Sequence, residues 1–328
     1  MRRRTFIAGL GSAAAWPLVA RAQQAAVPVI GFVHAGSAAD ASADRVRAFS
    51  KGLSETGHVE GQNVIVEYHW LEGQYDRLQP LIADLVRRRV AVIATPANTF
   101  AAIAAKAATA VIPIVFGVGE DPVKLGLVGS LARPGGNATG INYFSQEVNA
   151  KRIGLLHELV PKADRIAVLL NPATGPSAET TLRDAQESAR SMGMQIHILN
   201  ATTIGEIDAA FAVLAHDRSD ALFVAADTFL TSRRVQIATL AARDRIPAAY
   251  STRDAVAAGG LMSYGADLAA MYRQVGVYSG NILKGAKPAD LPVVQSTKFE
   301  FVINVGTARA LGLTIPETLL ATADEVIQ

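Results

Sequence analysis

The residues best suited to bind a charged ligand directly follow predicted strands, in two distant parts of the chain. In the first part, Thr95, Asn98 and Thr99 offer hydroxyl and amide groups that hydrogen-bond anions such as carboxylates. In the second part, Asp227 ends a predicted strand and precedes Thr228, and its carboxylate can pair with an ammonium group. The two sets together predict a site for a small zwitterion that bridges two parts of the protein.

Further residues at predicted strand ends extend this site. Ser37 and Asn171 add polar groups, while Phe116, Tyr250 and Tyr264 could wall an apolar or aromatic side chain. The complete candidate ligand-binding set is Ser37, Thr95, Asn98, Thr99, Phe116, Asn171, Asp227, Thr228, Tyr250 and Tyr264.

Several of these residues could have a structural role instead of binding a ligand. Thr99 is a good helix N-cap in its own right, and Asp227 is suited to cap a helix predicted to begin near Thr231. A phenylalanine inside an apolar strand, such as Phe116, is more often core than pocket. The sequence therefore leaves a capping or core role and a ligand role side by side at these positions.

The sequence carries no established catalytic signature. It lacks the glycine-rich nucleotide and dinucleotide motifs, H-E-x-x-H, and a G-x-S-x-G motif in the predicted mature chain. Cysteine is absent, which excludes disulfides, thiolate metal sites and cysteine nucleophiles. The six histidines lack metal-ligand spacing, and only His34 falls at the predicted site. We therefore predict no catalytic residues, no metal and no cofactor.

Two other functions stay open on the residues alone. An exported hydrolase or isomerase could use the same cleft, with His34, Glu120 and Asp227 as candidate acids and bases that lack obvious partners. A sensor would present its ligand-bound form to a receptor. The sequence does not separate sensing from transport, because both use that liganded form.

Residues 1–22 have the pattern of a signal peptide. Arginines at positions 2, 3 and 4 precede an apolar run, and Ala20-Arg21-Ala22 matches the small-x-small pattern at a cleavage site. Arg3-Arg4-Thr5-Phe6-Ile7 is similar to the twin-arginine core. We expect export to the periplasm with cleavage near Ala22, by either the twin-arginine or the general route.

The composition indicates a folded protein without a nucleic-acid footprint. Of 328 residues, 50% are hydrophobic and 18% are charged, a balance typical of globular domains. Removing the four arginines of the predicted leader leaves 27 basic against 29 acidic residues, a net charge of −2. Since nucleic-acid binding depends on basic surface, this charge argues against it. We expect a monomer that binds a small molecule.

Strands and helices alternate twice along the chain, with a turn-rich break at residues 134–137 between the two series. Continuous apolar runs such as Val90–Thr95 are typical of parallel strands covered by helices on both faces. The predicted fold is α/β, with two doubly wound parallel-sheet lobes joined by a multi-strand hinge. We assign residues 27–142 and about 266–290 to lobe 1, and about 143–265 and about 291–328 to lobe 2.

The predicted mature chain resembles the ABC transporter substrate-binding protein family, which includes tryptophan- and tyrosine-binding lipoproteins. The stretches that carry this resemblance are Val29–Phe32, Gly57–Val64, Ile112–Phe116, Asp121–Val123, Leu131–Gly140, Lys298–Asn304 and Ala323–Ile327. The resemblance implies a type I periplasmic binding protein fold with strands crossing between the lobes. It also implies capture of an aromatic or branched amino acid, or a related carboxylate, and delivery to an ABC permease in the inner membrane.

The resemblance reaches individual residues at a few positions. The turn from Thr95 to Asn98 and the strand end at Asp227 match positions that line the amino-acid site in similar proteins, and Tyr264-Gly265 resembles a ligand contact beside the hinge. The chain departs from the lipoprotein members because no cysteine follows its leader. We therefore expect a freely diffusing periplasmic protein.

Overall fold

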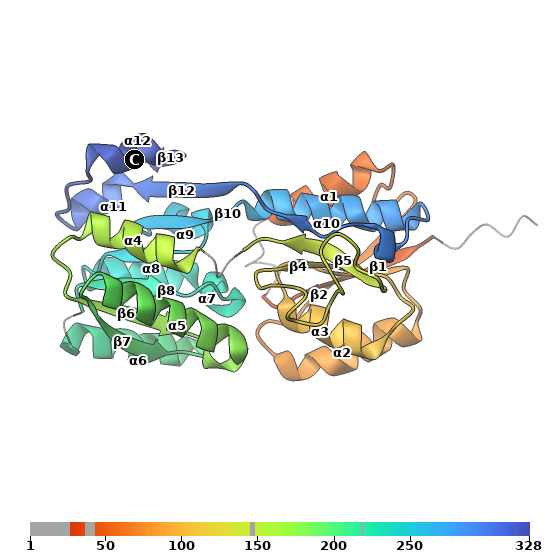
Figure 1. Cartoon of the computed structure of the whole chain (residues 1–328), viewed down its shortest axis with the longest axis horizontal. Coiled ribbons are helices and arrows are strands. Elements are labelled where there is room, and N and C mark those ends of the chain that lie inside the picture. The colour runs from red at the N-terminus through yellow and green to blue at the C-terminus, as the bar shows by residue number, and fades with distance from the viewer. Residues whose placement is uncertain (1–26, 37–42, 145–147, 218) are drawn as a thin grey trace, which may run out of the picture.

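The computed structural model describes residues 27–36, 43–144, 148–217 and 219–328. The predicted leader and Ser37 lie outside these residues. The chain forms two α/β lobes that lie side by side along the long axis of the molecule (Figure 1). No helix among the described residues is long and apolar enough to cross a membrane.

Lobe 1 is built on a parallel sheet with the strand order β11-β5-β4-β3-β1-β2. Its strands are β1 (Val29–His34), β2 (Ile65–Trp70), β3 (Val92–Thr95), β4 (Ile114–Val118), β5 (Ala138–Asn142) and β11 (Val294–Gln295). Its helices are α1 (Ala43–Glu55), α2 (Leu78–Arg87), α3 (Thr99–Ala108) and α10 (Leu268–Leu283), with short 3₁₀ turns at Tyr75–Arg77 and Pro288–Asp290.

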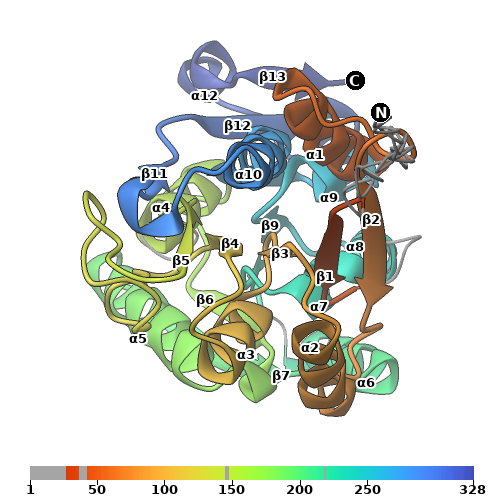
Figure 2. The ribbon, with the colours of Figure 1, turned by 90° about the vertical axis from the view of Figure 1, so that its right-hand side faces the viewer.

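Apolar strands explain why helices cover both faces of this sheet. Every residue of β3, β4 and β5 is buried, as a parallel strand between two helical layers requires. One face packs against α2 and α3, and the other packs against α1 and α10 (Figure 2). The carboxyl ends of β3 and β4 are consequently adjacent at one edge of the sheet.

Lobe 2 has the strand order β13-β12-β10-β9-β8-β6-β7. Its strands are β6 (Arg165–Leu170), β7 (Gln195–Asn200), β8 (Ala221–Val224), β9 (Ala248–Tyr250), β10 (Met262–Ala266), β12 (Phe299–Asn304) and β13 (Glu325–Ile327). Its helices are α4 (Asn149–Leu159), α5 (Pro176–Ser191), α6 (Ile204–Asp217), α7 (Thr228–Ser232), α8 (Arg234–Arg243), α9 (Arg253–Ala257), α11 (Val305–Ala310) and α12 (Glu317–Thr322), with a 3₁₀ turn at Pro172–Thr174.

The chain passes between the lobes after β5, after β10 and after β11 (Figure 1). The last passage lies later than the predicted boundary at about residue 291. Val294 and Gln295 pair with β5 in lobe 1, so the final lobe 2 segment starts with β12 at Phe299. The segments on either side of these passages form the hinge.

Close helix packing holds the returning helix α10 against α1 in lobe 1. A Cβ atom built on Gly52 would lie 1.9 Å from the backbone oxygen of Arg273, and one on Gly276 would lie 2.1 Å from the oxygen of Phe49. Only glycine allows the two backbones to approach this closely. The packing anchors the segment that arrives from lobe 2.

The sequence-based element predictions need several corrections. They omitted β5, α4, α11, α12 and β13, and they made both sheets wholly parallel, whereas β12 runs antiparallel to β10. The helix predicted to start near Thr231 begins at Thr228 and breaks at Arg233, giving α7 and α8. Strand β5 is short and contains glycine and asparagine, which explains why its apolar signal was weak.

Candidate ligand-binding cleft

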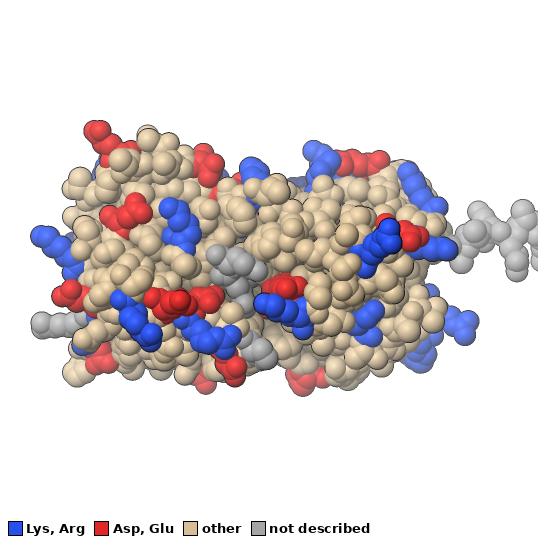
Figure 3. Space-filling view, in the orientation of Figure 1, with Lys and Arg blue, Asp and Glu red and all other residues tan. Residues whose placement is uncertain are grey.

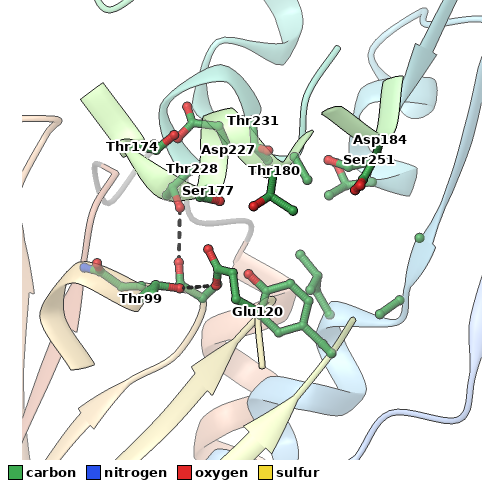
Figure 4. A pocket seen from close by; sticks show the side chains of 18 of the residues that line it. Thr99, Glu120, Thr174, Ser177, Thr180, Asp184, Asp227, Thr228, Thr231 and Ser251 are labelled. Carbon is green, nitrogen blue, oxygen red and sulfur yellow. Dashed lines mark hydrogen bonds between the residues drawn. The ribbon is translucent and has the colours of Figure 1, made fainter. Parts of the chain in front are cut away.

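A cavity of about 980 Å³ lies between the lobes and is lined by residues of both. On the face of the molecule seen in Figure 3, both lobes carry charged side chains of both signs. Inside the cavity the lining is mixed, with aromatic rings mainly from lobe 1. Most of the hydroxyl groups come from lobe 2, and several of them are labelled in Figure 4. Of the predicted site residues, those that line the cavity are Asn98, Thr99, Asp227 and Thr228.

The lobe 1 wall is organised by the start of α3. Asn98 caps this helix, and its Oδ1 accepts a hydrogen bond from the Ala101 amide at 3.1 Å. Its Nδ2 is buried and has no hydrogen-bond partner among the described residues. Thr99 donates its hydroxyl proton to Glu120 Oε2 at 2.7 Å, which fixes a carboxylate at the cavity wall (Figure 4).

The lobe 2 wall is organised by the start of α7. Asp227 caps this helix by accepting a hydrogen bond from the Leu230 amide at 2.8 Å, and the same oxygen accepts one from Asn171 Nδ2 at 3.2 Å. Burial raises the pKa of Asp227, and these hydrogen bonds oppose that shift. Asp227 therefore caps a helix and lines the cavity at the same time.

Direct contacts join the two walls. Thr228 donates a hydrogen bond across the cleft to the Ala97 carbonyl oxygen at 3.1 Å (Figure 4). Ala97 has a φ of 53°, a costly backbone conformation for a non-glycine residue. Beside the cavity, Arg45 of α1 pairs with Asp254 of α9 at 2.7 Å. The lobes therefore touch across the cleft, as in a closed arrangement.

Aromatic side chains that the sequence analysis missed line the lobe 1 side. Tyr75 and Phe100 pack edge to face with ring centroids 5.3 Å apart, and Tyr143 lies beyond the end of β5. Burial raises the pKa of Tyr143, and the nearby carboxylate of Glu120 raises it further. The position directly after a strand was the signal for Tyr143, and it was lost because β5 was not predicted.

Hydroxyl groups of lobe 2 were also missed. The ends of β6 and β9, the start of α5 and helix α7 bring several small polar side chains to the cavity (Figure 4). They are Thr174, Ser177, Thr180, Thr231 and Ser251. Their types are common in loops and at helix starts, so the sequence alone did not single them out.

Several predicted ligand residues do not reach the cavity. Thr95 and Phe116 are completely buried on β3 and β4, and Phe116 belongs to the apolar core, as the alternative interpretation held. Asn171 is buried and hydrogen-bonds Asp227 instead of lining the space. These positions were assigned from strand ends, but their side chains point into the lobe interiors.

The predictions for Tyr250 and Tyr264 also need correction, because neither residue lines the cavity. Tyr250 is buried in the lobe 2 core, and its hydroxyl has no hydrogen-bond partner among the described residues. The Tyr264 ring stacks on Phe299 with centroids 6.0 Å apart, and its carbonyl accepts a hydrogen bond from Arg152. Next to it, Gly265 and Ala266 border the cavity.

The described residues contain no group of three or more histidine, cysteine, aspartate or glutamate side chains that could hold a metal ion. His34, the candidate base, is buried at the end of β1 and accepts a hydrogen bond from the Gly36 amide through Nδ1 at 3.0 Å. Two α/β lobes, a hinge of several passages and a cleft lined by both lobes give the architecture of the type I periplasmic binding protein fold.

Comparison with known proteins gives the family. The model of the ABC transporter substrate binding protein family matches residues 26–327. The chain therefore belongs to that family, whose members and structural neighbours are solute-binding proteins. A tyrosine-binding protein of Clostridioides difficile is 27% identical over 271 residues, which cover 81% of this chain and 76% of the relative.

Solved structures agree with the fold. A domain from Streptococcus pneumoniae in complex with L-Trp is 26% identical with a TM-score of 0.82, and a conserved domain protein from Vibrio cholerae is 27% identical with a TM-score of 0.81. Each alignment covers 92% of this chain and 99% of the other. A ligand-free, open substrate-binding protein from Clostridium difficile is 24% identical with a TM-score of 0.63 over the same shares.

Proposed function

We propose that the protein is the periplasmic binding component of an ABC importer and that it captures an aromatic or branched amino acid for delivery to an inner-membrane permease. The observation that carries this proposal is a closed cleft in which the rings of Tyr75, Phe100 and Tyr143 face a wall with buried polar groups. A relative named as tyrosine-binding and a structural neighbour with bound L-Trp support an amino acid as the ligand.

The mechanism is capture by hinge closure. Ligand enters the open cleft, contacts one wall, and stabilises the state in which both walls contact it. Only a difference in affinity between the open and closed states can drive this step. The hydrogen bond from Thr228 to Ala97 and the pair of Arg45 with Asp254 join the two lobes, so they form as the cleft closes.

Asp227 is the proposed partner for the ligand's ammonium group. It is half-buried at the cavity wall, and desolvation disfavours its charged form, so a cationic partner would stabilise its carboxylate. A bound amino acid would thus supply the charge that this site lacks. The leader expected at residues 1–22 would deliver the mature protein to the periplasm, where the closed form docks on a permease.

A ligand screen with a shape measurement tests the proposal. Purified mature protein is heated with each of the twenty amino acids and with aromatic acids; ligand at about 100 times its dissociation constant stabilises by about 2.7 kcal/mol. We expect the aromatic or branched amino acids to raise the melting temperature. Solution scattering should then show a smaller radius of gyration with the best ligand. An unchanged radius with bound ligand contradicts closure, and turnover of the ligand contradicts a binding protein.

A further inference from the structure

A buried arginine beside the cleft lacks a partner for most of its charged group. Arg152 on α4 has no exposed surface, and its Nε donates a hydrogen bond to the Tyr264 carbonyl oxygen at 2.8 Å. The guanidinium lies over the Phe223 ring, 5.4 Å from its centroid. Its Nη1 and Nη2 have no hydrogen-bond partner among the described residues.

This arrangement is costly for the protein by itself. Burial lowers the pKa of Arg152 to about 9, and no carboxylate of the described residues offsets that effect. A buried charge that is neither paired nor fully hydrogen-bonded destabilises a fold by several kcal/mol. Arg45, which also borders the cavity and is also buried, has the ordinary solution, because Asp254 pairs with it at 2.7 Å.

The position of Arg152 suggests what balances its charge. Arg152 and Ala150, both near the start of α4, border the cavity together with Gly265 and Ala266. Helix α4 has eleven residues, and its N-cap, Val148, makes no side-chain hydrogen bond. Such a helix start offers free amide groups and partial positive charge to an anion.

An acidic group that also borders the cavity, Asp184, is already hydrogen-bonded at the start of α4. It accepts a hydrogen bond from Asn149 Nδ2 at 3.2 Å. No carboxylate of the described residues contributes to the pKa shift of Arg152, which is caused by desolvation. Within the described part of the chain, the two Nη atoms therefore lack an anion.

We propose that Arg152 and the first turn of α4 receive the carboxylate of the captured ligand. The inference rests on the proposed function and deepens it, because it makes the ligand a carboxylate and moves the carboxylate site from Asn98 and Thr99 in lobe 1 to lobe 2. With Nε held by Tyr264, both Nη groups can donate to one carboxylate, the two-bond geometry that arginine forms best. Lobe 1 then mainly recognises the ligand's side chain.

The experiment compares acids with their amides. Calorimetry on the mature protein measures L-tryptophan against L-tryptophanamide and L-tyrosine against L-tyrosinamide. The wild type should prefer the acids by about 100-fold, the scale of a buried charge pair. R152M should lose most of that preference while it binds the amides within about threefold of the wild type.

Controls separate a ligand role from a structural one. Because removal of an uncompensated buried charge does not weaken a fold, R152M without ligand should melt at or above the wild-type temperature. R45M should weaken acids and amides alike, since Arg45 acts through closure and not on the carboxylate. R152K, which keeps a charge but has one donor group, should retain a reduced preference for the acids.

Each other result overturns the anion site. Arg152 is structural if R152M keeps the wild-type preference for acids, or if it loses affinity for acids and amides equally. The same conclusion follows if R152M fails to fold while R152K binds acids as the wild type does. A wild type that prefers the amides excludes a carboxylate at Arg152. If the wild type binds no amino acid, amide or aromatic acid in the screen, the proposed function fails first and the anion site falls with it.

Discussion

The two walls of the cleft differ in how their charged groups are satisfied. In lobe 1, Arg45 pairs with Asp254 and Glu120 accepts a hydrogen bond from Thr99. In lobe 2, neither the half-buried Asp227 nor the buried Arg152 has an oppositely charged partner among the described residues. Under the proposed function, the ammonium and carboxylate groups of the ligand would supply these partners, and the aromatic rings of lobe 1 would contact its side chain.

Under the proposed function, this difference would make closure depend on ligand. No oppositely charged group among the described residues pairs with Asp227 or Arg152, so a zwitterionic ligand would offset part of their desolvation cost. In the described part of the chain, the hydrogen bond from Thr228 to Ala97 and the Arg45 pair with Asp254 join the two lobes. A ligand that satisfies lobe 2 and presents a side chain to lobe 1 therefore favours the closed state.

The largest effect is expected from Asp227→Ala. If the carboxylate pairs with the ligand's ammonium, its removal should weaken binding of an amine-bearing ligand by about 2 to 5 kcal/mol, measured by calorimetry. Asp227→Asn is the matched control, because its amide oxygen can still cap α7 through the Leu230 amide. Equal losses in both variants support a charge pair, and full recovery in Asp227→Asn would leave Asp227 a capping residue only.

A pair of helix glycines tests whether the lobes can be perturbed separately. Gly52→Ala places a Cβ against the backbone of Arg273, so it should destabilise lobe 1 by about 1 to 3 kcal/mol. Gly154→Ala on α4 of lobe 2 meets no atom within 4 Å and should stabilise by about 0.4 to 1 kcal/mol. Chemical denaturation measures both. Similar stability changes in the two variants would refute the tight α1–α10 contact.

A smaller effect is expected where the walls meet. Thr228→Val removes the hydrogen bond to Ala97 but keeps the shape of the side chain, so the closed state should lose about 0.5 to 1.5 kcal/mol. Ligand affinity should fall by the same amount, with an unchanged melting temperature of the free protein. Thr231→Val, at another hydroxyl of the same wall, is the control without an interlobe bond. Equal losses in both variants would argue against a closing role for Thr228.

The sequence predicted the architecture better than the cleft surface, and the reason is physical. The alternation of apolar strands and amphipathic helices determines which residues are buried, so the two-lobed α/β fold and the family were confirmed. A strand end indicates an edge of the sheet but not the direction of a side chain, so Phe116 and Tyr250 were wrongly assigned to the pocket. Arg152 was missed because its helix was not predicted and its isolation depends on residues far away in sequence.

The smallest expected effects are changes in folding stability with pH, and these changes have opposite signs in the two lobes. In lobe 1, the hydrogen bond from Arg88 lowers the pKa of Glu67. The Glu67 carboxylate therefore stabilises the fold at pH values above its pKa in the unfolded chain, and this stabilisation is lost as pH falls through its pKa in the folded protein. In lobe 2, burial raises the pKa of Asp227. The stabilisation from Asp227 is therefore complete at pH values below its pKa in the unfolded chain, and it is lost as pH rises through its pKa in the folded protein.

The variants Glu67→Gln and Asp227→Asn separate these two pH dependences of folding stability. Denaturation of the ligand-free protein from about pH 3 to pH 7 should show the wild type gaining stability relative to Glu67→Gln as pH rises, and losing stability relative to Asp227→Asn. The Glu67 effect should stay below about 1 kcal/mol because that pair is partly exposed. With a saturating amine-bearing ligand, the Asp227 slope should flatten or reverse, since an ammonium partner stabilises the carboxylate. A slope that ligand does not change would contradict a charge pair at Asp227, and the contrast between the two walls would then depend on Arg152 alone.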